Sequence, residues 1–234
     1  MKIGILGGTG PAGSALATRL ASVGHQVTIG SRSSDRAREV VDKLLAKWPG
    51  RDLAIGAADN SGASLADVVV IATPWEGAYG TATAVADNLD GKVVICMANA
   101  LTRIGKEFQP LVPPRGSVAG SVQAAVRDCH VAAAFHHVPA KELGDLDHPI
   151  DADVLVCSDF PHATEVVSQI VASIPNLRPL DAGGLSQATP IESFTAVLLQ
   201  LNVRYKTRVG VKFTGIAEPA SPLQAGDNAG AGES

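Results

Sequence analysis

Aromatic side chains make up only 4% of this 234-residue sequence, so its hydrophobic core must be built from alanine, valine, isoleucine and leucine. The sequence also has only three cysteines, Cys96, Cys129 and Cys157, and no two of them are close together. An odd number of separated cysteines, each inside an apolar run, argues against a disulfide framework. The composition therefore predicts reduced, buried thiols in a cytoplasmic protein.

The sequence lacks a strong excess of either charge. Its formal net charge is −4, and it contains no long basic run. Nucleic acids and anionic membranes attract clusters of lysine and arginine, so neither is expected as a partner. No apolar segment reaches the roughly 20 residues that a membrane-spanning helix needs. The apolar run after Lys2 is broken by glycines almost at once, which is not the pattern of a secretory signal.

Several catalytic motifs are also missing. There is no G-x-S-x-G, no Tyr-x-x-x-Lys pair, no Lys-x-x-x-Asn near the C-terminus and no paired metal-ligand motif. His136 and His137 are adjacent at the end of an expected strand, where neighbouring side chains point to opposite faces. They are therefore poorly placed to share a metal ion, and no metal site is expected.

The most informative motif in the sequence is a glycine-rich stretch near the N-terminus. The apolar run that begins at Ile3 ends in Gly8, Gly10 and Gly13, which are spaced G-x-G-x-x-G and are followed by an amphipathic helical pattern. In a dinucleotide-binding βαβ unit these glycines permit the turn, the approach of a pyrophosphate and close helix packing, respectively. Pro11 suits the first helical turn, whose free N–H groups face a phosphate.

The second expected strand, residues 26–31, indicates which dinucleotide is bound. An NAD site places Asp or Glu about 20 residues beyond the glycines, whereas an NADP site places a cation there. This sequence has Ser31 and Arg32 at that point, followed by Arg36 one helical turn later. These residues favour NADP over NAD because together they can hold the 2′-phosphate.

Strands and helices alternate along the rest of the chain, which predicts an α/β fold. The expected architecture is a Rossmann-type doubly wound, mainly parallel sheet with a smaller C-terminal α/β lobe. A polar, turn-rich segment, residues 140–153, suggests the lobe boundary. The expected division is an NADP-binding domain over residues 1–150, a small lobe over 151–216 and a disordered tail over 217–234.

Two further segments are candidates for the site. Thr73, Pro74 and Trp75 leave the carboxyl end of a buried strand, where ligands of open α/β sheets lie. Residues 101–116 form a long, proline-containing connection, and connections of this length are usually functional or mobile. The turn at residues 181–184 and His136 are expected on the cleft side, although the turn alone is most simply a strand-to-helix connection. Glu192 is most simply a carboxylate in the first turn of its own helix.

Several more specific motifs resemble one enzyme family, the F420H2:NADP oxidoreductases, also called NADPH-dependent F-420 reductases. The resemblance extends from Met1 to about Gly215. It rests on the sequences Gly7-Gly8-Thr9-Gly10, Gly30-Ser31-Arg32, Pro74-Trp75-Glu76, His136 with Pro139, Leu177-Arg178-Pro179-Leu180-Asp181-Ala182-Gly183, Glu192-Ser193 and Gly210-Val211-Lys212-Phe213.

The resemblance implies hydride transfer between C4 of NADP(H) and C5 of the 8-hydroxy-5-deazaflavin of coenzyme F-420. It also implies a homodimer with the deazaflavin in the cleft between the lobes. His136 would lie near the stacked rings, and His137 and residues 205–208 are in regions that could touch the deazaflavin. The implied phosphate-binding residues are Thr9, Gly10, Pro11 and Ala12 for the pyrophosphate and Ser31, Arg32 and Arg36 for the 2′-phosphate.

Direct hydride transfer is mainly a problem of positioning two rings, which agrees with the missing acid–base motifs. Our hypothesis is that no side chain is an essential proton donor and that His136 acts at most on ring orientation or on developing charge. Two alternatives are an NADPH-dependent reductase that passes hydride to a flavin or to a small carbonyl or imine, and a non-catalytic NADP(H) sensor. An imine or hydroxyacid reductase would normally need a longer helical substrate domain than residues 151–216 allow.

Overall fold

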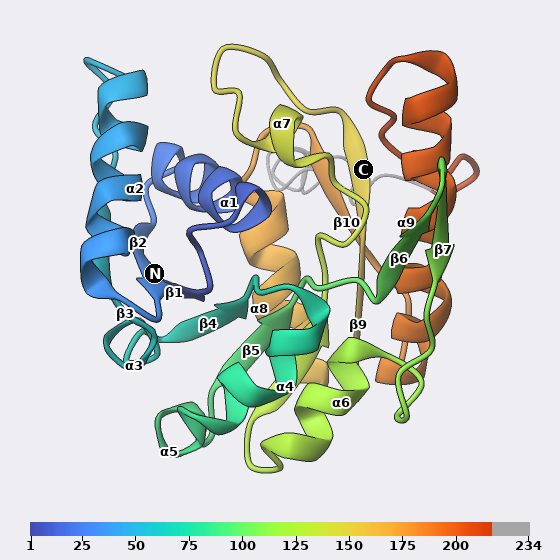
Figure 1. Cartoon of the computed structure of the whole chain (residues 1–234), viewed down its shortest axis with the longest axis horizontal. Coiled ribbons are helices and arrows are strands. Elements are labelled where there is room, and N and C mark those ends of the chain that lie inside the picture. The colour runs from blue at the N-terminus through green and yellow to red at the C-terminus, as the bar shows by residue number, and fades with distance from the viewer. Residues whose placement is uncertain (217–234) are drawn as a thin grey trace, which may run out of the picture.

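The computed structural model describes residues 1–216, so the tail predicted over 217–234 lies outside the described residues. Eight strands form one sheet in the order β10-β9-β8-β5-β4-β1-β2-β3, with helices on both faces (Figure 1). This confirms the α/β, Rossmann-type fold class. The strands of the sheet are β1 (Lys2–Leu6), β2 (Gln26–Ser31), β3 (Ile55–Asp59), β4 (Val68–Ile71), β5 (Val93–Cys96), β8 (His130–Ala133), β9 (Ala152–Ser158) and β10 (Leu177–Asp181). The helices are α1 (Pro11–Ser22), α2 (Ser34–Lys47), α3 (Asn60–Ala63), α4 (Trp75–Thr83), α5 (Ala86–Leu89), α6 (Val118–Ala125), α7 (Ala140–Leu143), α8 (Pro161–Ala172) and α9 (Ala188–Tyr205), with a short 3-10 turn, η1 (Leu185–Gln187).

Aliphatic side chains fill both faces of the sheet, because neighbouring residues of each strand point to opposite sides. In β4, Val68 and Val70 belong to the core beneath α1, α2 and α8, whereas Val69 and Ile71 belong to the core beneath α4, α6 and α9. All three cysteines are buried and unpaired, as the sequence predicts. Within residues 1–216 no helix is long and apolar enough to cross a membrane.

The sheet reverses direction at one point. Every neighbouring pair of strands is parallel except β8 and β9, where Ala132 lies opposite Ser158 and Ala133 opposite Cys157. The carboxyl ends of β9 and β10 therefore lie at the opposite end of the strands from those of β1 to β5 and β8. The turn at residues 181–184, expected on the cleft side, follows β10 and so lies at that opposite end. The predicted division near residue 150 falls at the start of β9, and it stays a prediction because β9 and β10 continue the same sheet.

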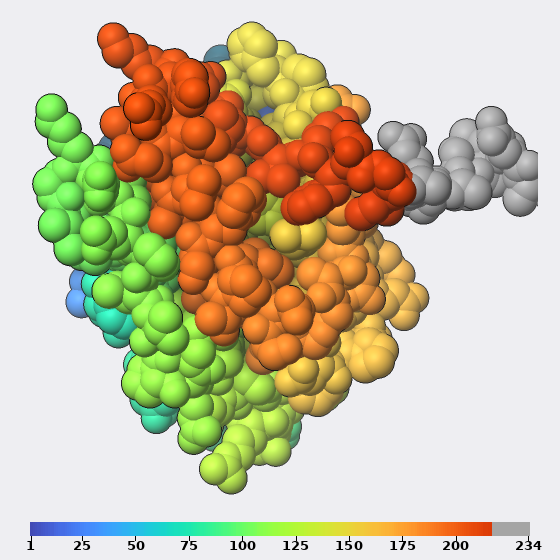
Figure 2. Space-filling view, turned by 90° about the vertical axis from the view of Figure 1, so that its right-hand side faces the viewer, coloured from blue at the N-terminus to red at the C-terminus, as the bar shows by residue number. Residues whose placement is uncertain are grey.

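Residues 101–116, which the sequence indicates as a long proline-containing connection, include regular secondary structure. They contain an antiparallel hairpin of β6 (Leu101–Ile104) and β7 (Glu107–Pro110), whose turn includes Gly105 at a φ of 62°. The hairpin stands outside the main sheet and lies beside α9 on the surface (Figure 2). The strand was not evident from the sequence because Pro110 ends an edge strand, a position where its missing N–H costs no ladder hydrogen bond.

The segment that contains the Gly210-Val211-Lys212-Phe213 motif, residues 209–213, forms no strand. Its backbone is held instead by a buried ion pair between Arg178 of β10 and Asp153 of β9, whose atoms Nη2 and Oδ2 are 2.7 Å apart. Asp153 Oδ2 also accepts a hydrogen bond from Phe213 N at 2.6 Å, and Arg178 Nη2 donates to the Phe213 carbonyl oxygen at 2.8 Å. One backbone hydrogen bond also joins the segment to β9, from Asp153 N to the Val211 carbonyl oxygen at 2.7 Å, so the ion pair and this main-chain contact hold the segment together.

Candidate functional site

The glycine-rich loop connects β1 to α1 and makes its turn at Gly7, one residue earlier than expected. Gly7 has a φ of 67°, and a Cβ there would lie 2.4 Å from Thr73 Cγ2. Gly8 is required for space instead, because its Cβ would lie 2.8 Å from the Ile5 carbonyl oxygen. A Cβ on Gly13 would lie 2.7 Å from Gly8 Cα, which agrees with the predicted close packing of helix on strand.

The N-terminus of α1 is open to an anion. Its N-cap is Gly10, which offers no capping side chain; Pro11 opens the helix, and the first turn has no acidic residue. The neighbouring helices differ. Ser33 caps α2 by accepting a hydrogen bond from Arg36 N, and Asp59 caps α3 by accepting one from Gly62 N at 2.7 Å. The unsatisfied N–H groups of α1 are therefore the natural partners of a phosphate at this edge.

A cavity of about 600 Å³ opens beside this loop, at the carboxyl ends of β1, β2 and β4. None of its lining residues carries a carboxylate, while two carry a guanidinium group. The lining comprises Gly7, Thr9, Gly10, Ser31, Arg32, Ser33, Arg36, Asn60, Ala72, Thr73, Pro74, Gly77 and Thr81. Most of the predicted phosphate-binding residues are thus brought together in one cavity, and their contact with a cofactor stays a prediction.

The proposed 2′-phosphate group of residues is built by the end of β2 and the start of α2. Ser31 is buried, whereas Arg32 and Arg36 are exposed. Within residues 1–216 neither arginine side chain makes a hydrogen bond or an ion pair, so both guanidinium groups are available to a ligand. An NADP phosphate would meet two cations here and no carboxylate, which fits the sequence-based choice of NADP.

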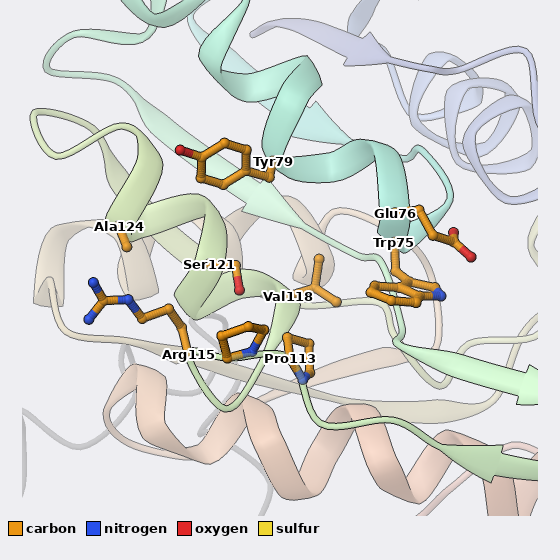
Figure 3. A pocket seen from close by; sticks show the side chains of 9 residues that line it. Trp75, Glu76, Tyr79, Pro113, Arg115, Val118, Ser121 and Ala124 are labelled. Carbon is orange, nitrogen blue, oxygen red and sulfur yellow. The ribbon is translucent and has the colours of Figure 1, made fainter.

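The remaining predicted cofactor residues do not line this cavity among the described residues: Gly8, Pro11, Ala12, Gly13, Trp75 and His136. Trp75 does not face this cavity because α4 lies between two cavities. Thr73 and Pro74 line the cavity beside the glycine-rich loop, and Trp75 lines the other. This second cavity has a volume of about 390 Å³, and Figure 3 shows the Trp75 and Tyr79 side chains on one wall and Pro113, Arg115 and Val118 on the other. Its aromatic and proline lining suits a flat apolar ring system.

His136 lies deeper than expected. Its side chain is 0% exposed, and burial lowers its pKa to about 3, so the ring is neutral. Neither ring nitrogen has a hydrogen-bond partner, and Nε2 is 4.0 Å from Glu192 Oε1. No atom of the ring is exposed in this conformation, and the expectation that His136 lies near the stacked rings stays a prediction. The main-chain carbonyl of His136 is instead the anchored group, accepting hydrogen bonds from Asn99 Nδ2 at 3.0 Å and Thr195 Oγ1 at 3.2 Å.

The sequence suggested that Glu192 is a carboxylate in the first turn of its own helix. In the structure it lies beyond the first turn of α9 and has another role. It accepts hydrogen bonds from Val118 N at 2.9 Å and Ala119 N at 3.1 Å, and so supplies the N-terminal anion of α6 from α9. Burial raises the pKa of its carboxyl group to about 7 despite these two donors. Sequence spacing could not reveal this role because the partner amides lie 73 and 74 residues away.

Two buried polar atoms at the same edge lack partners in the described part of the chain, Thr73 Oγ1 after β4 and Asn99 Oδ1 after β5. Unsatisfied buried oxygens are uncommon in folded proteins and fit a site that a polar ligand completes. The sequence pattern indicated Thr73 as a site residue but not Asn99 or Asn60. Both asparagines could have been found from their place in the chain. Each follows a strand of the sheet, and ligands of open α/β sheets lie at the carboxyl ends of the strands.

Comparison with known proteins gives a consistent result. Residues 2–100 match the family model of the coenzyme F420-dependent NADP oxidoreductases. The F420-dependent NADP reductase of Methanocaldococcus jannaschii is 37% identical over 222 residues, covering 92% of this chain and 99% of that protein. The enzyme of the same name from Methanothermobacter thermautotrophicus is 33% identical, covering 93% and 97% of the two chains.

A crystal structure from Arthrobacter sp. FB24, provisionally assigned as an F420-dependent NADP reductase, superposes with a TM-score of 0.76. It is 25% identical and covers 91% of this chain and 100% of its own. The similarities in sequence and in structure each cover more than 90% of this chain, and both point to the same family. The chain belongs to the F420-dependent NADP reductase family.

Proposed function

We propose that this protein is an NADPH-dependent F-420 reductase that transfers a hydride between NADP(H) and the deazaflavin of coenzyme F-420. The observation that carries the proposal is the cavity beside the glycine-rich loop, with an uncapped helix N-terminus at one end and Arg32 and Arg36 at the other. This arrangement is complementary to a dinucleotide that has a pyrophosphate in its middle and a 2′-phosphate on one ribose. Family membership supports the identity of the second substrate.

NADP(H) supplies the hydride chemistry itself, and the protein supplies binding and orientation. Thr9, Gly10 and the first turn of α1 would hold the pyrophosphate, and Ser31, Arg32 and Arg36 the 2′-phosphate. Thr73 and Pro74, at the end of β4, would border the cofactor between the two cavities. The aromatic cavity on the other side of α4 is the proposed approach for the second ring system, because Trp75 and Tyr79 offer ring surfaces there.

The direct test mixes the purified protein with NADPH and oxidised coenzyme F-420 and follows loss of the deazaflavin's visible absorbance. NADH replaces NADPH in one control, and FMN and riboflavin replace F-420 in two others. Rapid bleaching with NADPH and F-420, and much slower bleaching with NADH, is the expected result. Bound NADPH with unreacted F-420 would refute the proposed acceptor, and reduction of FMN or riboflavin would indicate a flavin reductase instead.

Replacing His136 with asparagine is expected to lower kcat by less than about tenfold and to leave the pH dependence of kcat unchanged between roughly pH 6 and 8. The reason is that the His136 ring is buried and neutral, with its pKa lowered to about 3, so it has no proton to give in this range. Steady-state kinetics over this pH range would check it. Loss of an ionisation together with a rate drop of several orders of magnitude would show that His136 is the proton donor.

We further propose that the protein works as a homodimer in the cytoplasm. Exposed apolar side chains lie on α9, on β6 and just after β7, the neighbouring elements seen in Figure 2; they include Phe194 and Val197 of α9, Ile104 of β6, and Val112. A second copy is the proposed cover for this apolar surface. The three free cysteines suit a reducing compartment. Light scattering would measure the molar mass of the wild-type protein and of Val197→Glu. The wild-type protein should be a dimer and the variant a monomer. A monomeric wild-type protein would refute the proposal.

A further inference from the structure

Asn60 is a residue of the cofactor cavity that the glycine motif and the arginine cluster do not include. It is the first residue of α3, directly after the Asp59 cap at the end of β3, and it lines the same cavity as Ser31, Arg32 and Arg36. β3 is the edge strand of the sheet and pairs with β2, so that Ser31 and Asp59 are partners in register. Asn60 therefore stands next to the proposed 2′-phosphate position.

The oxygen of the Asn60 carboxamide is held by the glycine-rich loop. Asn60 Oδ1 accepts a hydrogen bond from Gly7 N at 3.1 Å, across a sequence separation of 53 residues. A flipped carboxamide would place its NH2 group against the Gly7 N–H, which is also a donor, so this hydrogen bond fixes the orientation of the carboxamide. The hydrogen bond also restrains the residue whose positive φ makes the turn of the loop.

Close packing against β2 holds the side chain in place. A Cβ on Gly30 would lie 3.0 Å from Asn60 Oδ1 and 2.8 Å from the Ala63 side chain. A larger residue at position 30 would therefore push α3 away from the sheet. Gly30 belongs to the Gly30-Ser31-Arg32 motif, and this close packing explains why the motif has a glycine at position 30.

The nitrogen of the carboxamide is left with two hydrogens to donate. Within residues 1–216, Asn60 Nδ2 makes no hydrogen bond to the protein, and it belongs to a cavity whose lining has no carboxylate acceptor. The same cavity is lined by Ser31 and Ser33, with their hydroxyls, and by Arg32 and Arg36, and all four side chains can donate hydrogen bonds. A set of donors without a carboxylate among them is complementary to a phosphate.

We propose that Asn60 is a specificity-determining residue, whose Nδ2 donates a hydrogen bond to the ribose 2′-phosphate while Oδ1 holds the Gly7 turn. This inference rests on the proposed function in one respect only, namely that the nucleotide bound is NADP(H). It predicts that the residue contributes to NADP binding in two ways, a local one through Nδ2 and an indirect one through the loop.

Two substitutions separate these contributions. Asn60→Asp keeps an oxygen for the Gly7 N–H but replaces the NH2 donor with a negatively charged oxygen. Asn60→Ala removes both groups. The control is Gln26→Glu, the same amide-to-carboxylate change at an exposed position at the amino end of β2, the opposite edge of the sheet. Calorimetric titration gives Kd for NADP+ and NAD+, and a thermal melt verifies that each variant is folded.

Asn60→Asp is expected to raise Kd for NADP+ at least tenfold and Kd for NAD+ less than about threefold, because a hydrogen bond to a charged group contributes about 1.5–3 kcal/mol. Asn60→Ala should weaken both nucleotides, NADP+ more than NAD+, and Gln26→Glu should change neither. An equal effect of Asn60→Asp on NADP+ and NAD+, or none on either, would overturn the inference. Failure of the wild-type protein to bind NADP+ would instead overturn the proposed function.

Discussion

Replacing Arg32 and Arg36 together with alanine should raise the KM for NADPH by roughly 100-fold or more, since each charge-assisted hydrogen bond to a phosphate contributes about 1.5–3 kcal/mol. The KM for NADH should change little, because NADH carries no 2′-phosphate. Both guanidinium groups are free of protein partners among the described residues, so the substitution breaks no interaction of the fold. Steady-state kinetics with each nucleotide and saturating F-420 would measure the two values.

Arg38→Ala is the matched control, because Arg38 is an exposed arginine of the same helix that does not line the cavity. It removes one positive charge at a similar place on the surface and should change the KM for NADPH by less than about threefold, the scale of a screened surface charge. A similar rise in KM for NADPH and NADH in the double variant would contradict the assignment. It would mean that the arginines act on the loop and not on the 2′-phosphate.

Arg178→Met should lower the free energy of unfolding by about 3–5 kcal/mol, the usual cost of leaving one member of a buried ion pair without its partner. The variant leaves the Asp153 carboxylate, which is 0% exposed, with no guanidinium group beside it. It also removes a donor to the Phe213 carbonyl, so the C-terminal segment loses part of its anchor. For a protein of this size the corresponding fall in Tm is roughly 10 °C, measurable by calorimetry.

Arg51→Met is the control for this variant. The Arg51–Asp147 pair has a similar distance, 3.0 Å, but its side chains are 46% and 64% exposed, so its loss should cost less than about 1 kcal/mol. The pH dependence gives a second readout. Arg178 lowers the pKa of Asp153, so the stabilisation is complete above the carboxyl's ordinary pKa of about 4 and is lost as the pH falls below it. Arg178→Met should show a smaller loss of stability at acid pH, because within residues 1–216 only the hydrogen bond from Phe213 N remains on this carboxylate. Equal stability of Arg178→Met and Arg51→Met at neutral pH would contradict the assignment of the Arg178–Asp153 pair as stabilising.

The sequence was sufficient to predict the first βαβ unit because its signals are local. β2 spans the predicted residues, and Ser33 caps α2 through a hydrogen bond to a residue three positions later. β4 follows from an uninterrupted apolar run, which in a parallel sheet is buried on both faces. The cluster of Ser31, Arg32 and Arg36 was predictable for the same reason, because a strand end and the following helical turn lie together in any such fold.

The features that could not be predicted depend on partners far away in the sequence. Glu192 caps a different helix, and Trp75 faces a second cavity because α4 presents one side to each. The reversal at β9 moved the turn at residues 181–184 to the opposite end of the strands, since a strand's direction is set by the path of the chain and not by its composition. In each case the local pattern was compatible with two tertiary arrangements.

The difference in capping between the helices bears on the orientation in which a dinucleotide would bind. Five helices follow the carboxyl ends of β1 to β5 and so present their N-termini to one edge, but four of these are already occupied or acidic. Side chains cap α2, α3 and α6, and α4 has Glu76 in its first turn. Only α1 offers unsatisfied amides without a nearby carboxylate. A dinucleotide whose pyrophosphate lies at α1 would therefore bind in one polarity, because only one of the two polarities brings its 2′-phosphate to Arg32 and Arg36.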